Sequence, residues 1–379
     1  FHSRVHLVSF CMTLGTLVMF LTFQNPDFYK DNVTMLLNLE GFRILKEDDT
    51  RYGTRRKAVL ITFENYEELL SVYGNSVMRQ IQEAFGNYLR YDFIKDDLFY
   101  VHNGRFLLMA KHGHGYYDFR DKIMKRCERP FRFENGEMML SPCFAYSSDD
   151  IVFQSADEEE EAFRIAVTDA LRQGRGAIVR IDQNILDQAI KNVKVNRALE
   201  RAVHGEGLEV FFQPIFSTKE QKICSAEALV RIRDEELGLI YPDEFIWKAE
   251  ADSSILMLGQ RVFEKVCDFI KENNMRDLGL SYIEVNLSPV QCMRKQLADE
   301  FKEVTARYGV DPSYINLEIT ESGNTVSSVI QENMEALTFY GMSFSLDDYG
   351  TGFSNLISIF SMPLRIVKVD KSIVWQYFK

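Results

Sequence analysis

The sequence has no pair of cysteines at CxxC spacing and no histidine after His204. Its six cysteines are scattered, which indicates free thiols in a reducing compartment rather than a disulfide framework. A metal site in the C-terminal half would therefore need oxygen ligands, which suit Mg²⁺ or Mn²⁺ better than zinc. His112 and His114 flank a glycine, which is more typical of a loop than of a zinc site.

Positive charge is also scarce. The 379 residues contain 44 Lys and Arg against 56 Asp and Glu, giving a formal net charge of -12. Binding to a nucleic acid backbone requires a basic surface, so we expect no nucleic acid partner. The apolar fraction of 46% is ordinary for a globular protein, and the length predicts two domains plus additional segments.

One long segment, residues 5–23, contains no Asp, Glu, Lys or Arg. It has about the length of 20 residues that a bilayer-spanning helix requires. We therefore predict a transmembrane helix and juxtamembrane segment over residues 1–30. A buried core helix is the alternative, and a signal peptide is less favoured because no small-residue cleavage site follows. The chain begins with Phe1 rather than Met, as a fragment would.

Residues 31–182 mix strand and helix patterns in the manner of an α+β domain. Strands are expected at 57–63, 138–146 and 177–181, a hairpin at 97–110, and a helix at 66–89. The acidic run at 157–161 is interpreted as a helix start, where negative charge is favourable against the helix dipole. The helical periodicity of 183–205 predicts a connecting helix between two domains.

Residues 206–379 alternate strand and helix, which predicts an α/β domain with a mainly parallel sheet. A (β/α)₈ barrel is the natural expectation for such alternation, although the sequence supplies six strands. Strands are expected at 209–215, 224–232, 282–288, 314–320, 343–349 and 366–372, with helices at 243–250, 255–273, 295–308 and 326–340.

Polar side chains recur on these strands near their carboxyl ends, where a barrel places its active site. They are Glu227, Asn286, Glu318, Asp347, Asp348 and Lys368. Clustered carboxylates repel one another, and divalent cations are the simplest way to balance them. Adjacent aspartates suit a pair of metal ions that share a carboxylate and activate water for attack on phosphorus. Taken alone, the two aspartates before Gly350 would more simply indicate a turn.

Lys368 lies within the apolar run IVKVD. A buried lysine must find an anion or lose its proton, so it could serve as a general base, position water or contact phosphate. A structural ion pair with one of the carboxylates is the alternative. Arg231, four residues after Glu227, could reach a substrate phosphate.

At these residues the sequence resembles the EAL phosphodiesterase family. The family's blocks follow one another in order and spacing: FFQPI, AEALVRI, VNLS, LEITES, DDYGTG and KVD, between Phe211 and Asp370. The resemblance implies a modified (β/α)₈ barrel that hydrolyses cyclic di-GMP to linear pGpG with two Mg²⁺ or Mn²⁺ ions.

The resemblance also implies roles for single residues. Glu227, Asn286, Glu318 and Asp347 would bind the first metal, and Asp347 and Asp348 would reach the second. Glu321 would steady the DDYGTG loop, and Lys368 would be the catalytic lysine near the attacking water. Gln213 and Arg231 would contact substrate.

The sequence departs from the family at its end. The family continues with a seventh strand that carries a metal-binding glutamate in an EGVE-like block, and then with an eighth strand. This chain stops at Lys379, before both. We therefore expect an incomplete barrel with an exposed edge, inactive or poorly folded in this form, whereas the intact protein could be active.

The preceding domain resembles, far less closely, a GGDEF diguanylate cyclase domain. DNVTMLLNLEGF at 31–42 is similar to that family's opening pattern. Where the GGDEF signature would stand, the hairpin tip is His102-Asn103-Gly104-Arg105-Phe106, so its glycines are displaced and Arg105 replaces the acid. Thr62 stands at a metal-binding aspartate position, and the inhibitory site would lack its arginine. A degenerate, regulatory domain is expected, with GTP binding as the alternative.

Two functions remain in competition. One is a metal-dependent cyclic di-GMP phosphodiesterase, regulated by the degenerate domain and a membrane sensor, in the bacterial inner membrane with its catalytic domains in the cytoplasm. The other is an inactive EAL-type receptor for cyclic di-GMP. The retained ligand positions favour the enzyme over a receptor or a mere scaffold. Family resemblance alone suggests a homodimer.

Overall fold

The computed structural model describes residues 12–13, 26–54, 56–110, 115–148, 150–320, 328–350 and 362–377. The chain divides into two compact units, Phe1–Val193 and Lys194–Lys379. The division falls within α6 (Gln183–Val203), a 21-residue helix with no glycine or proline to interrupt it.

The N-terminal unit is built on a five-stranded sheet in the order β2-β3-β1-β6-β7. Its strands are β1 (Lys57–Phe63), β2 (Asp97–His102), β3 (Arg105–Ala110), β6 (Pro142–Ser147) and β7 (Ile178–Ile181). β1 pairs antiparallel with both β3 and β6, and β6 pairs parallel with β7. The β2–β3 hairpin forms as predicted. The strand predicted at 138–146 is β6, which starts four residues later at Pro142, because Met138 belongs to a separate short strand and residues 139–141 to none.

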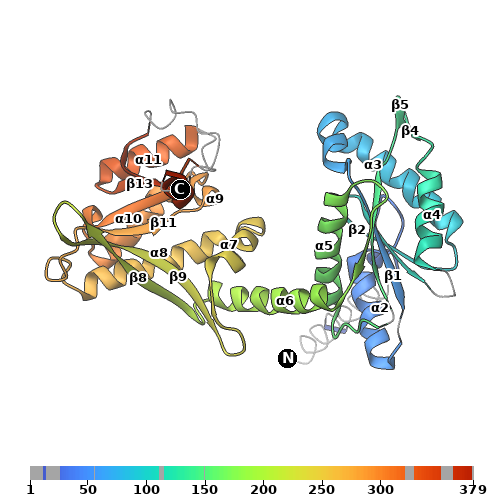
Figure 1. Cartoon of the computed structure of the whole chain (residues 1–379), viewed down its shortest axis with the longest axis horizontal. Coiled ribbons are helices and arrows are strands. Elements are labelled where there is room, and N and C mark those ends of the chain that lie inside the picture. Colours follow the sequence, from blue (N-terminus) through green and yellow to red (C-terminus); the bar gives the residue numbers. More distant parts are fainter. Residues whose placement is uncertain are drawn as a thin grey trace, which may run out of the picture. The chain divides into compact units, whose positions relative to one another are not determined.

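Both faces of this sheet are buried, which is why β1 reads as a continuous apolar run. Val59, Ile61 and Phe63 face one core cluster, and Ala58 and Leu60 face the other. The first core packs beneath α3 (Tyr66–Asp92) and α4 (Tyr116–Arg126), and the second beneath α2 (Leu39–Tyr52) and α5 (Ala156–Gln173) (Figure 1). η1 (Pro26–Tyr29) precedes α2, and the small ribbon of β4 (Phe131–Phe133) and β5 (Gly136–Met138) stands apart from the main sheet.

The C-terminal unit contains a seven-stranded sheet. Five strands run parallel in the order β9 (Lys222–Asp234), β11 (Ile283–Asn286), β12 (Ile315–Thr320), β13 (Ser343–Tyr349) and β14 (Leu364–Val369). β8 (Leu208–Ser217) and β10 (Gly238–Ile240) pair antiparallel with β9. The predicted α/β alternation with a mainly parallel sheet is confirmed, with antiparallel strands added beside β9.

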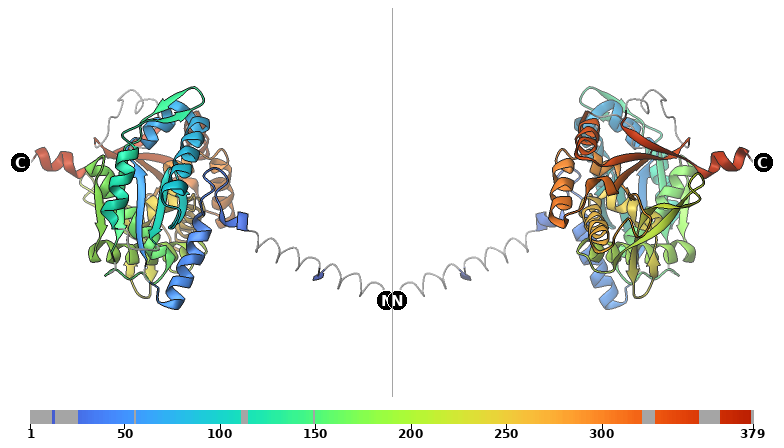
Figure 2. Two further views of the ribbon diagram at one scale, coloured as in Figure 1. Left: turned by 90° about the vertical axis from the view of Figure 1, so that its right-hand side faces the viewer. Right: turned by 90° about the vertical axis from the view of Figure 1, so that its left-hand side faces the viewer.

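Helices cover the outer face of this sheet (Figure 1). They are α7 (Pro242–Ala251), α8 (Ile255–Glu272), α9 (Pro289–Cys292), α10 (Leu297–Tyr308) and α11 (Ser328–Tyr340). The short η2 (Pro312–Tyr314) precedes β12, and α13 (Lys371–Tyr377) follows β14. The main core lies between the strands and α8, α10 and α11, where Phe263 stacks on Phe301 with ring centroids 3.9 Å apart. α13 points away from the strands (Figure 2).

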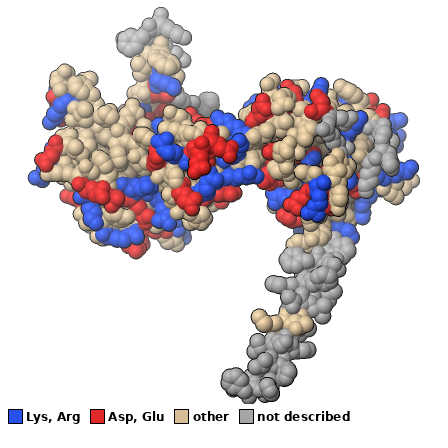
Figure 3. Space-filling model, turned by 90° about the horizontal axis from the view of Figure 1, so that it is seen from below, with Lys and Arg blue, Asp and Glu red and all other residues tan. Residues whose placement is uncertain are grey.

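The predicted membrane location is wrong. Within the ranges that the structure describes, no helix combines the length and the apolar character needed to cross a membrane. The longer helices are amphipathic; α8, for example, carries Arg, Glu, Lys and Asp on the side away from its core residues. The segment on which the prediction rested, residues 5–23, lies outside the described residues apart from Met12 and Thr13. On the face seen in Figure 3, acidic and basic side chains are interspersed.

The described cysteines are unpaired, and four of them are buried. Burial raises the pKa of Cys127, Cys267 and Cys292 to about 12 and that of Cys143 to about 11, because a thiolate is poorly solvated in the core.

We predict that these four thiols react with an aromatic disulfide reagent at pH 8 only after denaturation, while the half-buried Cys224 reacts in the native protein. Peptide mapping of the modified protein would check this; rapid native labelling of Cys267 would contradict it.

Candidate active site

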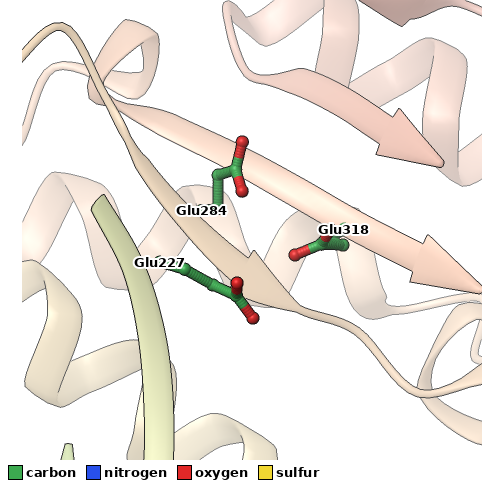
Figure 4. A group of neighbouring side chains, drawn as sticks. All are labelled: Glu227, Glu284 and Glu318. Carbon is green, nitrogen blue, oxygen red and sulfur yellow. The ribbon is translucent and has the colours of Figure 1, made fainter. Parts of the chain in front are cut away.

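Three carboxylates from three adjacent parallel strands converge inside the C-terminal unit (Figure 4). Glu227 of β9 lies opposite Glu284 of β11 in the strand register. Glu318 of β12 lies opposite Asn286, two residues further along β11. One oxygen from each carboxylate lies within 4.8 Å of the others. Because side chains alternate along a strand, this register directs all three to the same face of the sheet.

Lys368 of β14 inserts its ammonium group among these carboxylates. Its Nζ lies 2.7 Å from Glu284 Oε2 and 3.5 Å from Glu227 Oε2, and it also contacts Glu318 Oε1. Glu284 and Glu318 are almost fully buried, and the Lys368 side chain is 24% exposed. The ion pair that the sequence left as an alternative for Lys368 is therefore present, with three partners rather than one.

The electrostatics of this cluster are dominated by burial. Burial raises the pKa of Glu318 to about 8, against the opposing effect of Lys368, and nearby Glu227 and Asp347 add to the rise. Burial alone would lower the pKa of Lys368, yet its contacts with Glu284 and Glu318 raise that pKa above its ordinary value. The lysine is thus held as a cation, and the site retains an excess of negative charge.

Asn286 is the last residue of β11, and its amide nitrogen donates a hydrogen bond to Glu227 Oε1 at 3.0 Å. The backbone just after it is fixed by Ser288, whose hydroxyl caps α9 and also bonds Glu250 Oε1 at 2.7 Å. Gln291 in α9 packs against Gly259 so closely that any side chain there would collide with it. These contacts hold the end of β11 in place.

The two aspartates of β13 lie beside the cluster. Asp347 pairs in register with Thr320, two residues beyond Glu318, and its charge contributes to the raised pKa of Glu318. Asp348 adopts a left-handed backbone with φ of 53°, at an irregularity in the pairing with β14. Burial, followed by the charge of Asp347, raises the pKa of Asp348. Both aspartates belong to β13, which extends to Tyr349, although the regular strand pairing is interrupted at Asp348.

The predicted substrate contacts lie on β8 and β9. Gln213 is exposed and stands directly opposite Glu227 in the register. Arg231 lies four residues further along β9, with its guanidinium 4.7 Å from the centre of the Tyr241 ring and bonded to the Val230 carbonyl. Glu227 itself is in the middle of β9, not at its end as predicted, because β9 continues past the parallel sheet to pair with β8 and β10.

Sequence reasoning missed Glu284. The signal was present: a glutamate two residues before Asn286 in a short apolar strand must share its face. Two other predicted features, Glu321 and the His112-Gly113-His114 segment, lie outside the described residues.

Residues 196–378 match the family model described as the EAL domain. This part of the chain is an EAL domain. The family resemblance inferred from the sequence blocks is thus confirmed for the C-terminal unit. The matched residues include all four side chains of the cluster, which are Glu227, Glu284, Glu318 and Lys368.

Similar proteins extend over more of the chain. NbdA of Pseudomonas aeruginosa, named a cyclic di-GMP phosphodiesterase, is 26% identical over 67% of this chain and 32% of its own length. PdeR of Escherichia coli, named likewise, is 25% identical over 91% of this chain and 53% of its own. The S helix-GGDEF-EAL structure of Vibrio cholerae LapD, bound to c-di-GMP, shares the fold with a TM-score of 0.50 and 13% identity, over 94% of this chain and 86% of that one. The chain thus spans about a third to a half of the length of these two curated relatives.

We predict that Lys368→Met destabilises the C-terminal unit in metal-free buffer by about 3 kcal/mol, because it leaves buried carboxylates without a cation. Mn²⁺ should restore most of the loss. Chemical denaturation with and without MnCl₂ measures both effects. Lys371→Met, which removes an exposed lysine three residues away, is the matched control and should change little. Equal stability of the two variants without metal would contradict the prediction.

Proposed function

We propose that the EAL domain hydrolyses cyclic di-GMP to linear pGpG with the aid of Mg²⁺ or Mn²⁺. The observation that carries the proposal is the convergence of Glu227, Glu284 and Glu318 on a single ammonium group. One cation cannot balance three carboxylates with Asp347 nearby, so the donor set suits a divalent ion. NbdA and PdeR, which are similar to this chain, are named cyclic di-GMP phosphodiesterases.

The residues present fit a metal site made of oxygen donors. Within the part of the chain that the structure describes, the buried Glu318 Oε2 has no hydrogen-bond partner, whereas Oε1 contacts Lys368. Oε2 is therefore available to a cation. Glu227, Asn286, Glu318 and Asp347 would hold one ion, and Asp347 with Asp348 would hold a second. When bound, such ions would lower the pKa of a water ligand and would neutralise charge on the phosphoryl oxygens.

The chain's own side chains would orient the reactants. Lys368 stays protonated among its carboxylate partners, so it would donate hydrogen bonds to the attacking water or to a phosphoryl oxygen rather than act as a base. Gln213, exposed beside Glu227, would bind the substrate near the ions. Arg231 lies closer to the carboxyl end of β9. Its contact with the Tyr241 ring would orient the guanidinium group toward the second phosphate of the substrate. Glu321 is assigned to steadying the DDYGTG segment from its sequence position.

The second candidate is an EAL-type receptor that binds cyclic di-GMP without turnover. The LapD chain of similar fold was solved bound to c-di-GMP. A receptor needs neither a catalytic lysine nor a set of metal ligands. Here Lys368 is present and in contact with Glu227 and Glu318, two of the proposed ligands, which favours the enzyme.

We propose further that residues 31–182 form a degenerate GGDEF-like domain with a regulatory role, joined by 183–205 to the EAL domain at 206–379. The hairpin tip turns at Asn103 and Gly104, both with positive φ. The ring of Tyr66 packs directly on Gly104, and its hydroxyl accepts a hydrogen bond from Gln82 at 2.7 Å. A nucleotide would have to displace Tyr66 to approach this turn. A homodimer, as the family resemblance suggests, belongs to the same proposal.

The decisive test is pGpG release from cyclic di-GMP, followed by chromatography, with the full-length gene product and residues 1–379 in parallel. We expect release that requires Mg²⁺ or Mn²⁺ and stops with EDTA. Glu227→Ala should lower kcat/KM at least about 100-fold, since even the outer-shell partners of metal ligands contribute 10–100-fold. Glu235→Ala, an exposed glutamate in the turn after β9, should leave activity unchanged.

Metal-independent binding of cyclic di-GMP without release of pGpG by the full-length protein would establish the receptor instead. Activity that survives both EDTA and Glu227→Ala would refute the proposed site.

For the N-terminal unit we expect no cyclic di-GMP synthesis from GTP, because Arg105 stands where the cyclase signature has an acid. We also expect that GTP binding, measured by calorimetry, is weaker than in Tyr66→Ala, which opens the space over Gly104. Tyr73→Ala, a half-exposed tyrosine on the same helix, is the control. Tight GTP binding by the unaltered protein would show that Tyr66 does not obstruct the turn.

A further inference from the structure

Glu284 is one of three carboxylates that contact Lys368: its Oε2 lies 2.7 Å from the ammonium nitrogen, against 3.5 Å for Glu227, and Glu318 also touches this nitrogen. It is 2% exposed, and its register partners are Glu227 on one side and Asn316 on the other. Asn286, a proposed ligand, lies on the same strand two residues nearer its carboxyl end. Glu284 is therefore level with Glu227 in the register and lies two residues before the level of Asn286 and Glu318.

This position matters once a cation occupies the proposed site. Lys368 shares Glu227 and Glu318 with that cation, so the two positive charges compete for the same carboxylates. A lysine that lost both of these contacts would need another buried anion to hold its ammonium group inside the sheet. Glu284 alone among its three partners lies outside the proposed ligand set. It can hold the ammonium while Glu227 and Glu318 turn to the metal.

We infer that Glu284 is a positioning residue, which anchors Lys368 beside the metal site and so frees Glu227 and Glu318 for divalent cations. The inference rests on the proposed function and deepens it. Its effect on the metal passes through Lys368, in contrast to a fourth carboxylate ligand, which would act on the ion directly. The two possibilities differ in what happens when Lys368 is absent.

The test is a double-mutant cycle for Mn²⁺ affinity, measured by calorimetry and by the paramagnetic resonance signal of free Mn²⁺, on the full-length protein. Glu284→Gln should weaken Mn²⁺ binding about 10-fold, as expected for an outer-shell partner, because Lys368 then relies on Glu318 and Glu227. In the Lys368→Met background the same change should alter affinity less than twofold. Glu284→Asp, which keeps the charge, should recover at least half of the lost affinity on a logarithmic scale.

Glu159→Gln is the matched control. Glu159 is a fully buried glutamate of the N-terminal unit whose Oε2 lies 2.5 Å from Lys46 Nζ, so it reproduces the loss of a buried ion pair away from the EAL domain. It should leave Mn²⁺ affinity unchanged. Thermal unfolding of each variant identifies any variant that does not fold. If Glu284→Gln does not fold, Glu284→Asp replaces it in the double-mutant cycle.

The outcomes separate the inference from the proposed function. An equal loss of Mn²⁺ affinity with and without Lys368 would make Glu284 a direct ligand and overturn the inference, while leaving hydrolysis intact. No loss in either background would overturn it as well. Coupling between Glu284 and Lys368 in a protein that binds Mn²⁺ but releases no pGpG would support the inference and refute the phosphodiesterase. In an active protein, Glu284→Gln should lower kcat with little change in KM for cyclic di-GMP.

Discussion

The ammonium group of Lys368 inside a ring of buried carboxylates is the interaction on which the C-terminal unit depends. Carboxylates from β9, β11 and β12 could not be brought this close without a cation, because burial removes the water that would screen them. Lys368 reaches them from β14, two strands beyond Glu318, and so ties the far edge of the sheet to its centre. The same excess of negative charge that makes the cluster costly makes it receptive to a divalent ion.

The rest of the sheet serves to keep this cluster in register. The face opposite the cluster packs on α8, α10 and α11 through apolar residues such as Val285, Leu317 and Phe344. The cluster face is polar even below the carboxylates, where Ser343 Oγ donates to Asn316 Oδ1 at 2.8 Å and the Asn316 amide bonds Ser345. A one-residue slip of any strand would exchange these two faces, so the apolar core enforces the polar arrangement.

The N-terminal unit shows a different use of buried charge. Lys46 pairs with the fully buried Glu159, and Arg56 bridges Asp49 and Asp97. These pairs join α2 to α5 and to β2 and leave no comparable excess of one sign. Its hairpin tip is covered by Tyr66 rather than open to a phosphate. The unit is thus organised for packing, consistent with the regulatory part proposed for it.

The sequence by itself determined the alternation of strands and helices, the apolar core positions and the polar residues carried by successive strands. Local periodicity is enough for these, since each strand's two faces are set by its own residues; β1 and β13 match their predicted ranges. Only the tertiary structure decided which side chains meet. The extension of β9 placed Glu227 in mid-strand, and the register of β11 brought Glu284 rather than Asn286 against Lys368. Register depends on contacts between strands far apart in the chain, which no local pattern encodes.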